Sequence, residues 1–140
     1  MEFLDHFGAV FTWSSMLILC AGTIGGLLLG ATPGLSPTMA VALLIPFTFH
    51  MDPAQGLMLL GAAYTSTVAG GAVSAILLNI PGAPANIATA LDGNIMARKG
   101  AGARALQICF ISSAIGGVLG ILVLIFLTPL MPDSAPNIRH

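Results

Sequence analysis

Apolar residues fill three long stretches of the chain, and charged residues are confined to the short segments between them. No Asp, Glu, Lys, Arg or His lies within residues 7–49, 53–91 or 105–132. Each stretch is longer than the roughly 20 apolar residues that a membrane-spanning helix needs. The pattern therefore predicts an all-α polytopic membrane protein with a transmembrane domain at residues 14–130.

Two clusters of helix-breaking residues interrupt these stretches. The sequence is Pro-Gly-Leu-Ser-Pro at residues 33–37 and Asn-Ile-Pro-Gly-Ala-Pro at residues 79–84. Because proline and glycine interrupt helices, we expect a long helix before each break and a short apolar helix after it, at residues 38–49 and 85–97. A 12-residue helix reaches only about 18 Å. These segments are half-helices, too short to cross the membrane, and are either re-entrant segments or parts of kinked spans.

The two halves thus share one plan: a long helix, a Pro-Gly break and a half-helix. A broken helix leaves backbone amides and carbonyls free at membrane depth, and its N-terminal end attracts anions. Paired interrupted segments are typical of transporter binding sites. The predicted substrate-binding residues are Pro33, Gly34, Ser36, Pro37, Thr38, Asn79, Pro81, Gly82 and Asn86. The competing interpretation is a pair of proline kinks whose polar groups are satisfied by neighbouring helices.

Small and hydroxylated residues mark two further features of the long helices. Gly22, Gly26 and Gly30 recur every four residues, which predicts a ridge for close helix packing. The hydroxyls of residues 65–67 either face a cavity or bond back to their own helix. Asp52 before Pro53 has the form of a helix N-cap.

Charge sets the class of protein and its orientation. With 56% hydrophobic and 6% charged residues, the chain cannot cover a soluble surface, which averages about 25% charged residues. Arg98, Lys99 and Arg104 fall in a glycine-rich segment, and the positive-inside rule places this predicted loop, residues 98–104, in the cytoplasm. These three residues are interpreted as topology determinants. Asp92 is interpreted as part of a surface turn in preference to a cation or proton site.

The chain ends and the reactive side chains add little chemistry. Residues 1–13 predict an interfacial amphipathic helix with no signal peptide, and residues 131–140 predict a polar tail. Cys20 and Cys109 have no ligand-spaced partners, so neither a metal site nor a disulfide is expected. No nucleophile, base and orienting group cluster together. The sequence therefore predicts that the protein is not an enzyme and does not bind nucleic acid.

Several motifs resemble one known family, the large membrane subunit of the tripartite tricarboxylate transporters (TctA family). They occur in the family's order over nearly the whole chain. They are Gly-Ala-Thr-Pro-Gly-Leu-Ser-Pro at residues 30–37, Ala-Leu-Leu-Ile-Pro-Phe-Thr-Phe at 42–49, Ile-Leu-Leu-Asn-Ile-Pro-Gly at 76–82, Thr-Ala-Leu-Asp-Gly at 89–93 and Met-Ala-Arg-Lys-Gly at 96–100. The chain departs from many relatives in having Ala-Gly-Gly-Ala at residues 69–72 and a serine at position 66. Substrate choice is expected to differ accordingly.

The resemblance implies a multi-pass transporter in the bacterial inner (plasma) membrane. Its implied partners are a small membrane subunit, an extracytoplasmic solute-binding protein, a citrate-like carboxylate substrate and the lipid bilayer. It implies no cofactor, but coupling to a gradient of Na⁺ or H⁺. By this resemblance, one wall of the substrate path is formed by Pro33, Gly34, Ser36 and Pro37. The other wall is formed by Asn79, Pro81 and Gly82.

Two alternatives to a complete transporter follow from the length of the chain and the location of its charges. The family's large subunit is several-fold longer than these 140 residues, so the chain is expected to be its N-terminal portion. The main alternative is a truncated or accessory membrane subunit without transport activity of its own. A small self-contained exporter is less favoured, because it would need a carboxylate deep within a helix.

Overall fold

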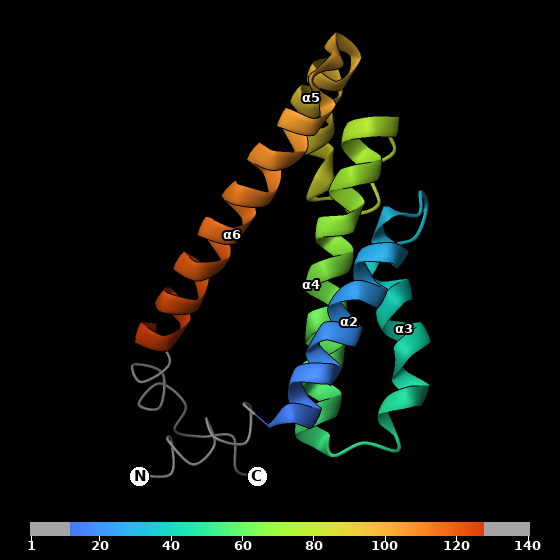
Figure 1. Cartoon of the computed structure of the whole chain (residues 1–140), viewed down its shortest axis with the longest axis vertical. Coiled ribbons are helices and arrows are strands. Elements are labelled where there is room, and N and C mark those ends of the chain that lie inside the picture. Colours follow the sequence, from blue (N-terminus) through green and yellow to red (C-terminus); the bar gives the residue numbers. More distant parts are fainter. Residues whose placement is uncertain (1–11, 128–140) are drawn as a thin grey trace, which may run out of the picture. The chain divides into compact units, whose positions relative to one another are not determined.

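The computed structural model describes residues 12–127. The elements in this range are α2 (Trp13–Ala31), α3 (Pro37–Thr48), α4 (Pro53–Leu78), α5 (Asn86–Met96), the π-type turn η1 (Ala97–Ala101) and α6 (Gly102–Leu127) (Figure 1). No strand occurs among these residues. The predicted interfacial helix at 1–13 lies almost wholly outside the described range, as does the predicted tail at 131–140.

Three helical segments of the described range are long and apolar enough to span a membrane: Trp13–Ala31, Pro53–Leu78 and Asn86–Leu127, the last of which includes α6. Together with the short apolar helix α3, they confirm the prediction of an all-α polytopic membrane protein. The helix breaks also lie where the prolines and glycines predict them.

α4 is the central helix of the compact unit that the described residues form up to Leu106. The glycine ridge of α2 packs against it, as the four-residue spacing predicts. A β-carbon at Gly22 would lie 3.0 Å from the carbonyl oxygen of Leu59, and one at Gly26 would lie 2.5 Å from that of Ala63. Both residues are buried. Because the contacts advance in the same direction on both helices, α2 and α4 are parallel.

α3 returns antiparallel to α2 and α4 (Figure 1). Its last residue, Thr48, lies 3.3 Å from the β-carbon that Gly56 would carry. Asp52 and Pro53 then occupy the N-cap and first position of α4, as predicted, although the Asp52 side chain makes no capping hydrogen bond. The short connection therefore closes a helical hairpin.

The two halves share the predicted plan of a long helix, a Pro-Gly break and a short helix, but they differ in the direction that the short helix takes. Side-chain amides of α5 bond to α4 at two levels, Asn86 to the carbonyl of Val68 and Asn94 to that of Ile76. The later residue of α5 bonds to the later residue of α4, so the two helices are parallel. The chain at residues 79–85 therefore doubles back along α4 before α5 begins, whereas the first break reverses the direction of the helices.

The structure corrects the prediction of a loop at residues 98–104. Residues 97–101 make the compact turn η1, in which Gly100 adopts φ 81°. α6 starts at Gly102, so Arg104 belongs to its first turn. The described residues from Gln107 to Leu127 belong to a separate unit, and nearly all of their side chains are exposed.

Candidate functional site

The two helix breaks meet at Gly82. A β-carbon at this position would lie 3.1 Å from the carbonyl oxygen of Leu35, 3.6 Å from the Cα of Gly71 and 3.9 Å from the carbonyl oxygen of Gly30. Gly30 ends the ridge of α2, Leu35 belongs to the first break, and Gly71 lies in α4. We call these four residues the junction.

The first break is a tight turn that follows α2. The amide of Thr32 donates to the carbonyl of Leu29 at 3.2 Å, and the amide of Leu35 donates to the carbonyl of Thr32 at 3.3 Å. Gly34, with φ 91°, follows Pro33, which is the residue pattern of a type II turn. This turn directs the carbonyl of Leu35 toward Gly82.

The Ser36 side chain caps the start of α3. The Ser36 hydroxyl accepts from the amide of Met39 at 3.3 Å. It also lies 2.8 Å from the hydroxyl of Thr38. Pro37, at the first helical position, is buried and has no N–H. Ser36 therefore has a structural role as the N-cap.

Asn79 is the first residue of the second break and lies away from the junction. It caps α4 with φ 59° and is exposed, and its amide donates to the carbonyl of Ala75. Asn79 follows Gly71 by eight residues, which is about 12 Å along a helix. The predicted wall is therefore spread along α4: Gly82 is at the junction, while Asn79 is at the end of the helix. Pro81 is exposed between them.

Asn86 begins α5 beside the junction. Its amide donates to the carbonyl of Ala83 at 2.9 Å. The residue is 5% exposed, and its side chain donates to the carbonyl of Val68 at 3.0 Å. The predicted ligand is thus engaged with α4.

The starts of α3 and α5 converge at the junction. α3 runs from it toward the beginning of α4, whereas α5 runs toward the end of α4 (Figure 1). The N-terminal end of a helix carries about half a positive charge. Two such ends meet here beside the backbone carbonyls of Gly30 and Leu35, an arrangement that suits an anion accompanied by a cation.

Other polar residues of the long helices serve packing. The hydroxyls of Thr65, Ser66 and Thr67 all donate to carbonyls of α4 itself. Ser66 also reaches the carbonyl of Gly22 at 3.3 Å. This decides the question left open by the sequence in favour of bonding to the backbone.

Sequence reasoning missed two members of the junction, Leu35 and Gly71, and one residue that holds the other end of α5 against α4, Asn94. The carbonyl of Leu35 carries no side-chain signal. Gly71 belongs to a Gly-Gly pair within a helix, a pattern that often marks close backbone approach. Asn94 is buried, and its side chain donates to the carbonyl of Ile76. The sequence signal for this contact was a second asparagine eight positions after Asn86.

The cluster of basic residues follows Asn94. The Nε of Arg98 donates to the Oδ1 of Asn94 at 2.9 Å, and Asn94 is held by α4. Arg98, Lys99 and Arg104 are exposed. They lie at the opposite end of α5 from the junction, in keeping with a role in topology.

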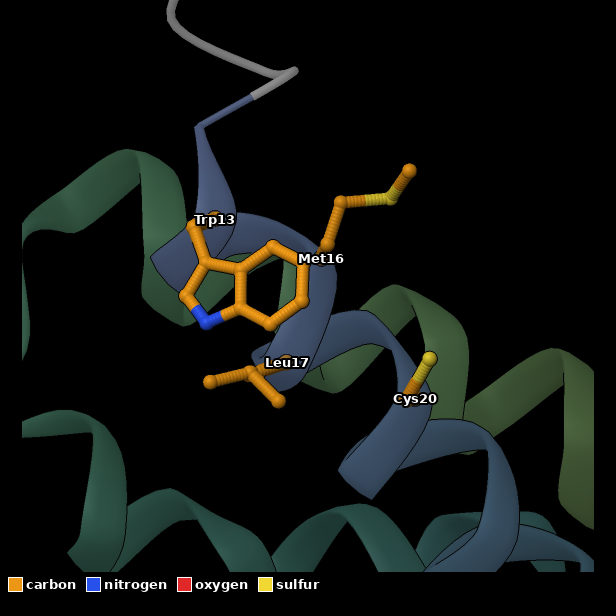
Figure 2. Close-up of a pocket in the computed structure, with 4 residues that line it drawn as sticks. All are labelled: Trp13, Met16, Leu17 and Cys20. Atoms are coloured by element: carbon orange, nitrogen blue, oxygen red, sulfur yellow. The ribbon is translucent and has the colours of Figure 1, made fainter.

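A pocket of about 430 Å³ lies at the start of α2 and is lined by Trp13, Met16, Leu17 and Cys20. Figure 2 shows that Trp13 and Leu17 project from one side of the helix, while Met16 and Cys20 point elsewhere. These side chains offer no charged group to a carboxylate. Within residues 12–127, no cluster of three His, Cys, Asp or Glu residues could hold a metal ion.

Comparison with known proteins identifies the family. Residues 16–139 match the model of the tripartite tricarboxylate transporter TctA family. The chain belongs to this family. A TctA-family chain with three apolar helical segments is a multi-pass membrane protein.

One relative of the TctA-family chain is an uncharacterized 52.8 kDa protein in the TAR-I ttuC′ 3′ region of Agrobacterium vitis. The two are 38% identical over 114 residues, which are 81% of this chain and 23% of the relative. The chain thus spans about a quarter of that protein's length. No solved structure matches the chain.

Proposed function

We propose that this chain forms part of the pathway by which a tricarboxylate transporter carries a citrate-like carboxylate across the bacterial inner membrane. The observation that carries the proposal is the contact between the two breaks at Gly82, which brings the N-terminal ends of α3 and α5 together. Helix N-termini bind carboxylates through backbone amides and the helix dipole, without a buried basic side chain.

The proposal includes coupling to a gradient of Na⁺ or H⁺. Carbonyl oxygens of interrupted helices are the ligands that Na⁺ uses in other secondary transporters. The carbonyls of Gly30 and Leu35 both approach Gly82. A coupling ion beside the carboxylate would offset its charge, and the two would then move together.

The proposed partners follow from the family. A small membrane subunit and an extracytoplasmic solute-binding protein would complete the transporter, and the solute-binding protein would deliver the carboxylate. Nothing in the described residues suggests catalytic chemistry, and we propose that the protein acts as a carrier with its basic segment, residues 98–104, on the cytoplasmic side.

The test is uptake of radiolabelled citrate into cells that express the full-length membrane subunit with its two partners. We expect uptake that collapses when the ion gradient is dissipated and that requires all three components. Related tricarboxylates and dicarboxylates should be supplied in parallel, because substrate choice is part of the question. Absence of uptake for every carboxylate, with all components in the membrane, would contradict the proposal and favour the accessory-subunit alternative.

A further inference from the structure

The Asn86 side chain contacts the backbone of α4 at Gly71, where no side chain separates them. Its Nδ2 donates to the carbonyl of Val68 at 3.0 Å. A β-carbon at Gly71 would lie only 2.5 Å from the same nitrogen. The amide therefore needs both the carbonyl of Val68 as acceptor and the absence of a side chain at position 71.

Asn94 provides an internal comparison. Its Nδ2 donates to the carbonyl of Ile76 at 3.0 Å, and Asn94 is 8% exposed, compared with 5% for Asn86. Each asparagine reaches a carbonyl 18 residues earlier in the chain. Asn94 differs in its location, since it lies two helical turns beyond Asn86 and bonds to Arg98.

The segment from Gly82 to Asn86 is attached to α4 at both ends. Gly82 lies against Gly71 at one end, and Asn86 is bonded to Val68 at the other. This segment carries the start of α5. The electrostatic effect of a helix end falls off within one turn, so a displacement of the segment weakens its hold on an anion.

We propose that Asn86 is a positioning residue which, with Gly71, fixes the second break against the first and so sets the affinity of the junction for its carboxylate. The proposal rests on the proposed function. It replaces direct contact between Asn86 and the substrate with an action through the backbone of residues 82–86. Asn94 holds the other end of α5 and does not set this affinity.

The first test is the concentration dependence of citrate uptake by the complete transporter. We expect Asn86→Ala to raise the half-saturating concentration roughly three- to tenfold, the effect of losing one hydrogen bond, with little change in maximal rate. Asn94→Ala should leave that concentration within about twofold of the original protein. Equal effects of both substitutions, or none for Asn86→Ala, would overturn the proposal.

A double substitution tests the role of Gly71. We expect Gly71→Ala to weaken affinity in the same direction as Asn86→Ala, because its β-carbon would displace the amide. The double variant should have the same affinity as Asn86→Ala alone, because the side-chain amide that the β-carbon would displace is then absent. Additive losses would show that the two residues act separately and would overturn the proposed pairing.

A measurement without substrate separates this proposal from the proposed function. A cysteine introduced as Pro81→Cys lies on the exposed part of the second break, and its rate of reaction with a maleimide reports how firmly the break is held. We expect Asn86→Ala to speed labelling, and Asn94→Ala to leave it unchanged. Unchanged labelling with Asn86→Ala would overturn the positioning role. Faster labelling in a protein that transports no carboxylate would support that role while refuting the proposed function.

Discussion

Gly82 and Leu35 are 47 positions apart in the sequence, yet a β-carbon at Gly82 would lie 3.1 Å from the carbonyl oxygen of Leu35. Each residue belongs to a different helix break. The contact makes the two breaks parts of one structure beside α4. The predictions below test the packing that creates this contact, its orientation in the membrane and its role in transport.

The first prediction concerns the packing of α2 against α4. Gly26→Ala would place a β-carbon 2.5 Å from the carbonyl oxygen of Ala63, so the helices must separate. We expect a loss of stability of about 1–3 kcal/mol, typical of overpacking, seen as a lower midpoint of thermal unfolding in detergent.

Gly25→Ala is the matched control for this substitution. A β-carbon at Gly25 meets nothing within 4 Å, and alanine is the better helix former. The control should therefore unfold at or above the temperature of the original protein. Equal midpoints for both variants would contradict the packing described for the ridge.

The second prediction concerns the left-handed cap of α4. Asn79 adopts φ 59°, a conformation that glycine accepts and β-branched residues resist. We expect Asn79→Gly to retain the stability of the protein, and Asn79→Val to lower it by about 1–2 kcal/mol. Thermal unfolding of the two variants side by side provides the measurement, and a valine variant as stable as the glycine variant would refute the assignment of the cap.

The third prediction concerns orientation. Ala103 is exposed next to Arg104, so Ala103→Cys adds a label without removing a basic residue. We expect a membrane-impermeant maleimide to react with it in inverted vesicles and not in intact cells, because basic segments remain cytoplasmic. Reaction in intact cells would reverse the orientation.

The sequence predicted the locations of helices better than their directions. A long helix was expected before each break, and the structure has α2 at Trp13–Ala31 and α4 at Pro53–Leu78. Apolar runs and breakers act locally, so these bounds can be inferred from local residues. Prolines and glycines do not specify the direction that follows a break, because a few backbone dihedral angles decide it. The parallel course of α5 therefore required the structure.

The same limit applies to the candidate site. Pro33, Gly34, Pro81 and Gly82 were identifiable because their residue types interrupt helices. The sequence could not show that Gly82 meets Leu35, since that contact joins a glycine to a carbonyl and depends on the packing of α2 and α4. Likewise, the expected loop at residues 98–104 is compact because Gly100 accepts a positive φ, a local choice that glycine permits without requiring.

The most direct test of the central claim is citrate uptake by the complete transporter carrying Gly82→Leu, with Gly25→Leu as the control. A β-carbon at position 82 lies only 3.1 Å from the carbonyl oxygen of Leu35, so a leucine there forces the two breaks to shift, whereas a β-carbon at Gly25 meets nothing within 4 Å. Membrane levels of both variants are measured by immunoblotting. We expect Gly82→Leu to abolish uptake at a normal membrane level and Gly25→Leu to retain uptake. Full uptake by Gly82→Leu would contradict the assignment of the junction to the substrate path.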